Sequence, residues 1–310
     1  MKTVLVGFGD IAPKHLEVLK EFNCEVVGIV TRNYDKAVIK GKTHGIEKVY
    51  KSIDSISKDE FDFFTILVNP ENNQEVLRQV IPFKKPILIE KPVTFSSSSL
   101  NQIIDFNAKY SCNIMVAMNR RFYSVFHKGL KYLQEKDKKI DAVLIDAPER
   151  FSDINLPKFN EIVRKNWMFS NSIHCVDLIR FFGGDVNKIE VNSEPKKFVY
   201  SAIGHCNNDV NFTYVSNWKS PGSWSVTLYS DETKIVYNPL ENGMIFEKND
   251  KKIIESSYED RKFKPGFYFQ LNHFIENILH NNKLKWPAPD LQDHNKTIKL
   301  IESIYHMNNN

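Results

Sequence analysis

The chain has 310 residues, a length that favours two domains over one. Hydrophobic residues make up 42% and charged residues 26%, which is ordinary for a soluble globular protein with a sizeable core. The 42 basic and 38 acidic residues leave a formal net charge of only +4 and form no concentrated basic face, so composition argues against nucleic acid as a partner.

Short apolar runs alternate with amphipathic segments over the first 118 residues. Several runs are nearly continuous Val, Ile and Leu, which is typical of strands buried on both faces. We expect strands at 3–6, 25–30, 48–50, 63–68, 86–89 and 113–117, and helices at 14–22, 72–81 and 97–109. This repetition of strand and helix predicts a doubly wound parallel sheet with right-handed crossovers.

The pattern changes after this region. Residues 122–136 predict one amphipathic helix, with Phe122, Phe126, Leu130 and Leu133 on its apolar face. Alternation with a period of two predicts strands at 140–145, 188–191, 210–218, 224–228 and 234–237, as in an antiparallel sheet with one covered face. Further helices are expected at 173–182, where two glycines follow as a stop signal, at 267–279 and at 293–305.

These elements predict an α/β protein of two domains. Residues 1–119 form an N-terminal Rossmann domain with a doubly wound parallel sheet, and residues 120–310 form a C-terminal α+β domain with a mostly antiparallel open sheet. The boundary is expected near Met118–Phe122.

Cysteine usage and apolar runs bear on the compartment. The four cysteines lie far apart without a C-x-x-C pair, so we expect neither a disulfide framework nor a metal site. No stretch approaches the roughly 20 apolar residues that span a bilayer. The N-terminus has a short apolar run without a cleavage-type signal. We therefore expect a cytoplasmic protein without a membrane partner.

A glycine motif stands between the first expected strand and the first helix. The run Gly7-Phe8-Gly9-Asp10-Ile11-Ala12 fits G-x-G-x-x-A, in which Gly7 allows a tight turn, Gly9 lets a pyrophosphate approach the backbone and Ala12 permits close packing. The start of the helix offers free N–H groups to phosphates. A tight turn without a ligand is the alternative, but the position directly after the first strand favours dinucleotide binding.

The end of the second strand bears on which dinucleotide binds. NAD enzymes usually carry an acidic residue there, which accepts the ribose hydroxyls. This chain has Thr31, Arg32 and Asn33, and Arg32 is suited to pair with a 2′-phosphate. NADP(H) is therefore favoured, and NAD(H) remains possible because some NAD enzymes tolerate a neutral residue at this position. A solvated loop charge is the alternative for Arg32. We also assign Val68 and Asn69 to the cofactor site.

Glu90, Lys91 and Pro92 follow the fifth strand. Ligands of open parallel sheets bind at the carboxyl ends of strands, which places Glu90 and Lys91 where the nicotinamide would lie. A lone lysine before proline is more often structural, so the assignment depends on the glycine motif that precedes it.

Five motifs, taken in order, resemble the glucose-fructose oxidoreductase / inositol dehydrogenase (Gfo/Idh/MocA) family over nearly the whole chain. They are GFGDIAPKH at 7–15, EKP at 90–92, NRRF at 119–122, HCVDLIRFFGGDV at 174–186 and GFYFQLNHFIENIL at 266–279. The resemblance implies that Lys91 lines the active site, that its bond to the following proline is often cis, and that the C-terminal domain binds substrate and forms a homodimer or homotetramer through its sheet.

The resemblance also implies a helix carrying an Asp-x-x-x-His pair, with the histidine as acid or base. The histidine matches His174, but position 170 is Ser170. A local shift of register, a subgroup that uses Ser170 or Asn171, or a changed reaction would each explain this departure. Asp177 lies on the same helix face as His174. A buried core histidine without a catalytic role is the alternative for His174.

Substrate residues are expected where the two domains meet. They are Lys91, Asn119, Arg120, Arg121, Tyr123, Ser170, Asn171 and His174. Either arginine is suited to a carboxylate, a phosphate or a nucleotide-sugar diphosphate, although internal ion pairs explain both equally well. Trp218 and Tyr229 are suited to stack on a sugar or to pack against a second subunit.

These residues predict an NAD(P)-dependent dehydrogenase or reductase acting on CH–OH groups. His174 would take the hydroxyl proton as hydride leaves for the nicotinamide, and Lys91 would stabilise charge on the same oxygen. The family implies a sugar, cyclitol or nucleotide-sugar as the small-molecule substrate. Two alternatives stay open. A reductase of a C=N or C=C bond would need no histidine base, and a catalytically inactive cofactor-binding sensor would fit the serine at 170.

Overall fold

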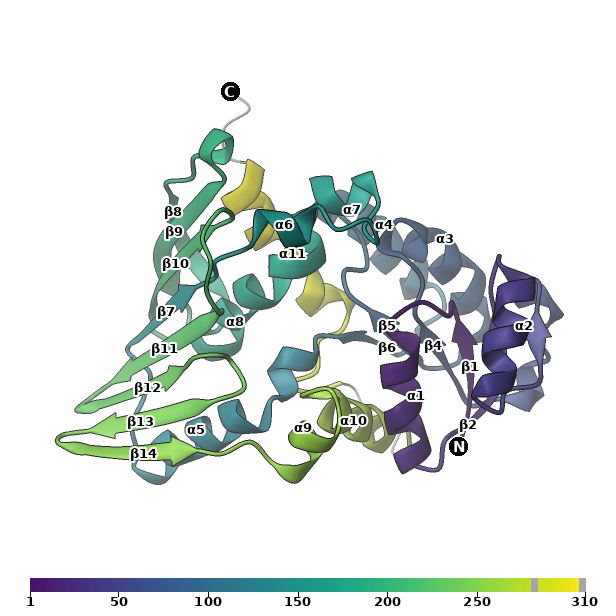
Figure 1. The fold of residues 1–310 in the computed structure, drawn as a ribbon, viewed down its shortest axis with the longest axis horizontal. Coiled ribbons are helices and arrows are strands. Elements are labelled where there is room, and N and C mark those ends of the chain that lie inside the picture. Colours follow the sequence, from purple (N-terminus) through teal and green to yellow (C-terminus); the bar gives the residue numbers. More distant parts are fainter. Residues whose placement is uncertain (280–283, 307–310) are drawn as a thin grey trace. The chain divides into compact units, whose positions relative to one another are not determined.

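The computed structural model describes residues 1–279 and 284–306 (Figure 1). Internal contacts separate the chain into two units. Unit 1 comprises Met1–Asn119 and Phe267–Asn295, and unit 2 comprises Arg120–Gly266 and Lys296–Asn310. The sequence-based division at 119/120 stays a proposal for the folding domains, and the contacts place the segment Phe267–Asn295 with the N-terminal sheet.

Unit 1 is built on a six-stranded parallel sheet in the order β3-β2-β1-β4-β5-β6. The strands are β1 (Lys2–Val6), β2 (Glu25–Val30), β3 (Val49–Tyr50), β4 (Phe63–Ile66), β5 (Ile87–Glu90) and β6 (Ile114–Ala117), each within two residues of its predicted bounds. Strands β1 and β4 are neighbours in the sheet but are not consecutive in the chain. At such a point a doubly wound sheet opens a ligand crevice at the carboxyl ends of its strands. This order confirms the predicted Rossmann fold.

Five helices accompany this sheet among the described residues of unit 1. They are α1 (Ala12–Glu21), α2 (Tyr34–Thr43), α3 (Pro70–Val80), α4 (Ser97–Ala108) and α10 (Phe267–Leu279), with short 3₁₀ turns at Ile53–Ser55, Lys58–Glu60 and Ile81–Phe83. The sequence analysis did not predict α2, because only Ala37 and Gly41 of this helix are buried and its apolar pattern is weak. Helix α10 packs on α1, where the His15 and Phe267 ring centroids are 4.8 Å apart.

Unit 2 contains an eight-stranded sheet in the order β14-β13-β12-β11-β7-β10-β9-β8 (Figure 1). The strands are β7 (Ala142–Asp146), β8 (Val186–Val191), β9 (Val199–Cys206), β10 (Asn211–Asn217), β11 (Ser225–Ser230), β12 (Thr233–Tyr237), β13 (Gly243–Glu247) and β14 (Asp250–Ile254). Only β7 and β10 pair in parallel, so the mostly antiparallel sheet is confirmed. The prediction missed β9, β13 and β14; β14 is an exposed edge strand without apolar alternation.

Helices cover one face of this second sheet. They include α5 (Ser124–Glu135), which lies on β13 and β14, and α8 (Ile173–Gly183), which lies on β7 and β10. The other described helices of unit 2 are α6 (Phe151–Ile154), α7 (Glu161–Lys165) and α9 (Tyr258–Lys262). Helix α11 (Leu291–His306) begins in unit 1 and belongs to unit 2 from Lys296. Along β11, Val226 and Leu228 are fully buried whereas Tyr229 is exposed, which confirms the one-sided burial expected from the alternation.

The predicted helix at 122–136 begins later than expected, at Ser124, because Asn119–Phe122 form a short 3₁₀ turn. Glycine is required at position 129 of this helix, since a Cβ there would overlap the Tyr237 hydroxyl, only 1.9 Å away. Among the described residues, none of the helices is both long enough and apolar enough to cross a membrane.

Candidate functional site

Unit 1 has a pocket of about 470 Å³ at the carboxyl ends of β1, β2 and β4. Residues that the glycine motif and the second strand predicted for the cofactor line this pocket: Gly7, Phe8, Gly9, Asp10, Thr31, Arg32, Asn33, Val68 and Asn69. The pocket therefore collects, from three separate loops, residues that the sequence assigned to one ligand.

The glycines shape this pocket in two different ways. Gly7 has φ +92°, and a Cβ there would lie 2.8 Å from the Leu67 carbonyl, so only glycine fits. At Gly9, by contrast, no heavy atom of the described residues lies within 4 Å of where a Cβ would be. The backbone at Gly9 consequently faces open space, as a phosphate cradle requires. Helix α1 begins at Ala12, which is fully buried, and its N-cap Ile11 supplies no side-chain cap.

Four basic side chains line the same pocket. Arg32, Lys36, Lys40 and Lys51 line it, and Asn33 caps α2 by accepting the Lys36 backbone N–H. Two carboxylates, those of Asp10 and Glu75, also line the pocket, so cations outnumber anions there. The sequence analysis did not single out the three lysines, because two of them lie on the helix that it missed.

The EKP motif is held by side chains of unit 1. Glu90 Oε1 lies 2.8 Å from His15 Nε2, and Glu90 Oε2 accepts the Lys91 backbone N–H at 3.2 Å. The bond from Lys91 to Pro92 is cis, as the resemblance implied. Asn73 Nδ2 donates to the Pro92 carbonyl at 2.9 Å. Ile11, Ala12, Glu90 and Lys91 are not among the residues that line the pocket.

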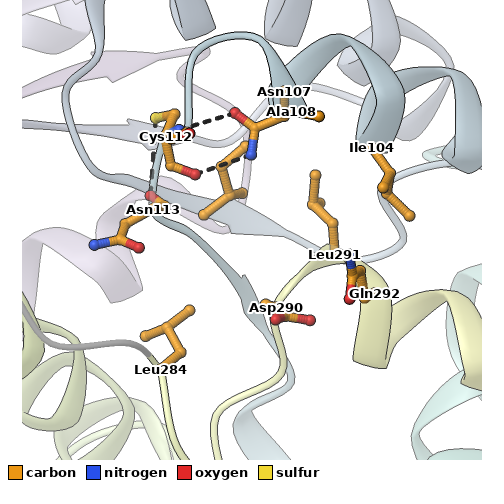
Figure 2. Close-up of a pocket in the computed structure, with 11 residues that line it drawn as sticks. Ile104, Asn107, Ala108, Cys112, Asn113, Leu284, Asp290, Leu291 and Gln292 are labelled. Atoms are coloured by element: carbon orange, nitrogen blue, oxygen red, sulfur yellow. Dashed lines mark hydrogen bonds between the residues drawn. The ribbon is translucent and has the colours of Figure 1, made fainter.

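A second pocket in unit 1, of about 430 Å³, is lined by residues of α4, β6 and the segment around Leu291 (Figure 2). It sits where α4 ends and β6 begins, hence at the amino ends of the strands. Asn107 Nδ2 donates to the Cys112 carbonyl at 2.9 Å, and Asn107 Oδ1 accepts the Cys112 backbone N–H at 3.1 Å. The Cys112 thiol donates to the Lys85 carbonyl, and burial raises the pKa of Cys112 to about 12. A thiol that stays protonated at neutral pH is a poor nucleophile, so we assign this pocket no catalytic role.

In unit 2, His174 is the second residue of α8 and is 2% exposed. The five residues before this helix, Met168–Ser172, are π-helical. Ser170 and Asn171 in this segment are partly buried. Single π-turns occur frequently at functional sites, and this one includes the position at which the serine replaces the aspartate expected from the resemblance.

The two neighbouring arginines have different surroundings. Arg121 forms a buried bidentate ion pair with Asp177, at 2.6 and 2.7 Å, and Thr297 donates to the same carboxylate at 2.6 Å. The Arg120 guanidinium instead lies over the Trp224 ring, 4.8 Å from its centroid. Arg120 Nε is buried and has no hydrogen-bond partner in the described part of the chain. Internal pairing therefore accounts for Arg121 but leaves Arg120 available.

Two other predicted residues near this position are buried. Asn119 is 4% exposed. Tyr123 is 3% exposed, its hydroxyl donates to Glu241 Oε1 at 3.1 Å, and burial raises the pKa of Tyr123 above its ordinary range.

Sequence reasoning missed Glu149, which lies just beyond β7 and is 5% exposed. Its carboxylate accepts hydrogen bonds from Ser172 Oγ at 2.6 Å and from Asn171 Nδ2 at 3.2 and 3.1 Å. Burial raises the pKa of Glu149 and attraction from Arg120 opposes this. No motif surrounds Glu149 in the sequence, so only its neighbours in space could identify it.

The two sheet aromatics also differ. Trp218 is 3% exposed and packs against Tyr200, with ring centroids 4.7 Å apart. It is therefore part of the core of unit 2 and has no face to offer a sugar. Tyr229 is 42% exposed on the open face of the sheet.

Comparison with known proteins bears on these observations. Residues 1–118 match the Gfo/Idh/MocA family, described as "Oxidoreductase family, NAD-binding Rossmann fold". The trans-1,2-dihydrobenzene-1,2-diol dehydrogenase of Xenopus tropicalis is 26% identical over 122 residues. The match covers 39% of this chain and 37% of that enzyme, so it spans little more than a third of the length of this curated relative.

Solved structures extend the likeness to the whole fold. An oxidoreductase from Agrobacterium radiobacter, in complex with NAD+, L-tartaric acid and magnesium, has a TM-score of 0.80 at 16% identity and covers 99% of this chain and 95% of its own. An aldose-aldose oxidoreductase from Caulobacter crescentus, complexed with glycerol, has a TM-score of 0.82 at 15% identity and covers 99% and 96%. By the match of its first 118 residues, the chain carries the NAD-binding Rossmann fold of the Gfo/Idh/MocA oxidoreductases.

Proposed function

We propose that this protein is an NAD(P)-dependent oxidoreductase that transfers hydride between the nicotinamide and a carbinol or ketone carbon of a sugar, cyclitol or nucleotide-sugar. The observation that carries the proposal is the pocket of unit 1, where the open backbone at Gly9 stands before a helix start without a side-chain cap. The aldose-aldose oxidoreductase and the dihydrodiol dehydrogenase among the similar proteins support a CH–OH substrate.

NADP(H) is the favoured cofactor in this proposal. The end of β2 offers Thr31, Arg32 and Asn33 in place of an acidic residue, and Lys36, Lys40 and Lys51 line the same pocket. These cations would hold the 2′-phosphate, which carries the charge that distinguishes NADP from NAD. NAD(H) remains the alternative, since the similar Agrobacterium radiobacter oxidoreductase is a complex with NAD+.

The proposed catalytic residues are Lys91 and His174. The bound dinucleotide supplies the hydride acceptor or donor. His174 takes the hydroxyl proton during oxidation and returns it during reduction, because imidazole exchanges protons near neutral pH. Lys91 donates a hydrogen bond to the reacting oxygen and stabilises its developing negative charge.

Arg120 is the proposed anchor for an anionic group of the substrate. Its stacking on Trp224 fixes the guanidinium plane, and its buried Nε still needs an acceptor. Arg121 is less suited, because Asp177 already neutralises it. Asn119, Tyr123, Ser170 and Asn171 are proposed to complete the substrate site. The ligand that fits this set is a sugar bearing a carboxylate or a phosphate.

We further propose a cytoplasmic homodimer or homotetramer formed through the open face of the unit 2 sheet. Ile203, Val215 and Tyr229 are 53%, 38% and 42% exposed. The strand registers put all three on the same face of β9, β10 and β11. A row of exposed apolar side chains on one sheet face is typical of a subunit contact.

Titration of the purified protein with NADH and NADPH, followed by nicotinamide fluorescence, tests the proposal. We expect tighter binding of NADPH, and loss of that preference in Arg32→Ala. Lys14→Ala, an exposed basic change on α1, serves as the control. A preference for NADH would overturn the role given to Arg32 and the lysines, and binding of neither nucleotide by folded protein would overturn the oxidoreductase itself. A screen of sugars, sugar acids and sugar phosphates with the preferred cofactor then tests the substrate class.

A further inference from the structure

Unit 2 buries a carboxylate, that of Glu149, which the proposed reaction does not use. The backbone N–H of Glu149 donates to the Asn217 carbonyl at 2.9 Å, so the residue is aligned with the end of β10. Burying an ionisable group is unfavourable unless hydrogen bonds compensate for the lost water. The groups that donate to this carboxylate therefore show which part of the molecule it holds.

Those donors come from one short segment of the chain. Ser172 Oγ donates to Glu149 Oε1 at 2.6 Å, and Asn171 Nδ2 reaches both carboxylate oxygens. Both residues belong to the π-helical segment Met168–Ser172. A π-turn is wider than an α-turn and rare, and it persists where its surroundings determine it. Glu149, from just beyond β7, thus fixes the last two residues of this unusual turn.

His174 follows this turn directly. It stands two residues after Ser172, and the helical backbone is continuous between them. A displacement of Ser172 would consequently be transmitted to the imidazole. Burial is the main cause of the raised pKa of Cys175, the residue after His174; Arg120 opposes it, and the carboxylates of Glu149 and Asp146 add to it.

We propose that Glu149 is a positioning residue for His174. By accepting the hydrogen bonds of Asn171 and Ser172 it fixes the π-helical segment, and through it the place of the imidazole at the start of α8. It thereby brings to this turn the carboxylate that Ser170 does not provide. This inference rests on the acid–base role proposed for His174.

The test exchanges the amide and the carboxylate of the hydrogen bond between Asn171 and Glu149. Glu149→Gln removes the carboxylate, and the double variant Glu149→Gln with Asn171→Asp restores an amide–carboxylate pair with donor and acceptor reversed. Asp146→Asn, which changes an exposed carboxylate at the end of β7, three residues before Glu149, is the matched control. Two readouts are taken on the full chain: the histidine-ring proton–nitrogen NMR spectrum, in which His174 is identified by the signal lost in His174→Gln, and steady-state turnover.

We expect Glu149→Gln to move the His174 signal while leaving most of the nine histidines unchanged, and the double variant to return it. Turnover should fall by about 10- to 100-fold in Glu149→Gln at an unchanged nucleotide Kd. Recovery in the double variant is judged on the His174 signal alone, because Asn171 is itself a proposed substrate residue. An unmoved His174 signal in Glu149→Gln overturns the inference, as does a general change of all histidine signals that the double variant does not reverse. If no carbinol is oxidised by the wild type, the proposed function fails while the NMR comparison still decides the inference.

Discussion

The proposed cofactor pocket of unit 1 and the His174 region of unit 2 are built by different means. The pocket depends on backbone: a glycine at positive φ, a second glycine facing open space and a helix start. The His174 region depends on side chains that tertiary structure brings together, such as Glu149 from the end of β7 and Asn171 from the π-turn. Backbone sites can be read from short motifs because each residue acts through its own conformation, whereas side-chain networks combine residues that are distant in sequence.

The largest expected effect concerns His174. His174→Gln removes the proposed base but keeps a polar side chain of similar length, so we expect kcat to fall by about 10²- to 10⁴-fold with an unchanged nucleotide Kd. Steady-state kinetics together with fluorescence titration measure the two quantities. Full activity in this variant would favour reduction of a C=N or C=C bond, which needs no histidine base. The His174 region would then have no catalytic role to compare with the pocket of unit 1.

The side-chain network should also carry much of the stability of unit 2. Asp177→Ala leaves Arg121 buried without its counter-charge, and the side chains of this pair are only 5% and 2% exposed. We expect the free energy of unfolding in urea to fall by about 3–5 kcal/mol. Glu135→Ala, which breaks the exposed pair with Lys131, should cost at most about 1 kcal/mol. If the two variants lost the same free energy of unfolding, the buried ion pair would contribute no more to stability than an exposed one.

The backbone pocket predicts the opposite behaviour, with loss of binding but not of stability. A side chain at Gly9 meets open space, so Gly9→Asp should leave the melting temperature within a few degrees of the wild type. The added carboxylate would repel the phosphates, and we expect the nucleotide Kd to rise by about 100-fold. Gly9→Ala, which adds only a methyl group, should weaken binding less. A Gly9→Asp protein that binds as tightly as the wild type would place the dinucleotide elsewhere.

The smallest expected effect distinguishes the two dinucleotides. Removing one ammonium with Lys36→Ala or Lys40→Ala should weaken NADPH by about 10-fold or less and NADH hardly at all. Raising the salt concentration should reduce the same difference, because exposed charges are screened. The ratio of the two Kd values, measured at low and at high salt, checks both statements. Equal weakening of both nucleotides would assign the lysines to the shared diphosphate instead.

The sequence predicted the elements that bury a continuous apolar pattern and missed those that bury little. All six strands of the parallel sheet were predicted within two residues, because strands buried on both faces are continuously apolar. Helix α2 was missed since it buries so little, and with it Lys36 and Lys40 were missed as pocket residues. The edge strand β14 was missed for a similar reason, because four of its five residues are exposed.

The candidate residues of unit 2 could be predicted only in part. The sequence favoured His174 through its motif but could not choose between Arg120 and Arg121, because the choice depends on Asp177 and Trp224 in space. Trp218 was considered for sugar stacking, although β10 leads it into the core. Glu149 carries no local signal at all, since its partners are more than 20 residues away in the chain.

The π-turn before α8 has a consequence for comparing this chain with others by alignment. A turn of this kind holds one residue more than an α-turn, so the helix residues on its two sides are out of phase by about 100°. An alignment that keeps His174 in its column without a gap therefore pairs Ser170 with a residue that points in a different direction in any homologue whose helix is regular. A one-residue insertion within the π-helical segment Met168–Ser172 would account for both the π-turn and the serine at position 170. Homologues with the same extra residue should be recognised by that insertion and by a carboxylate at the position of Glu149.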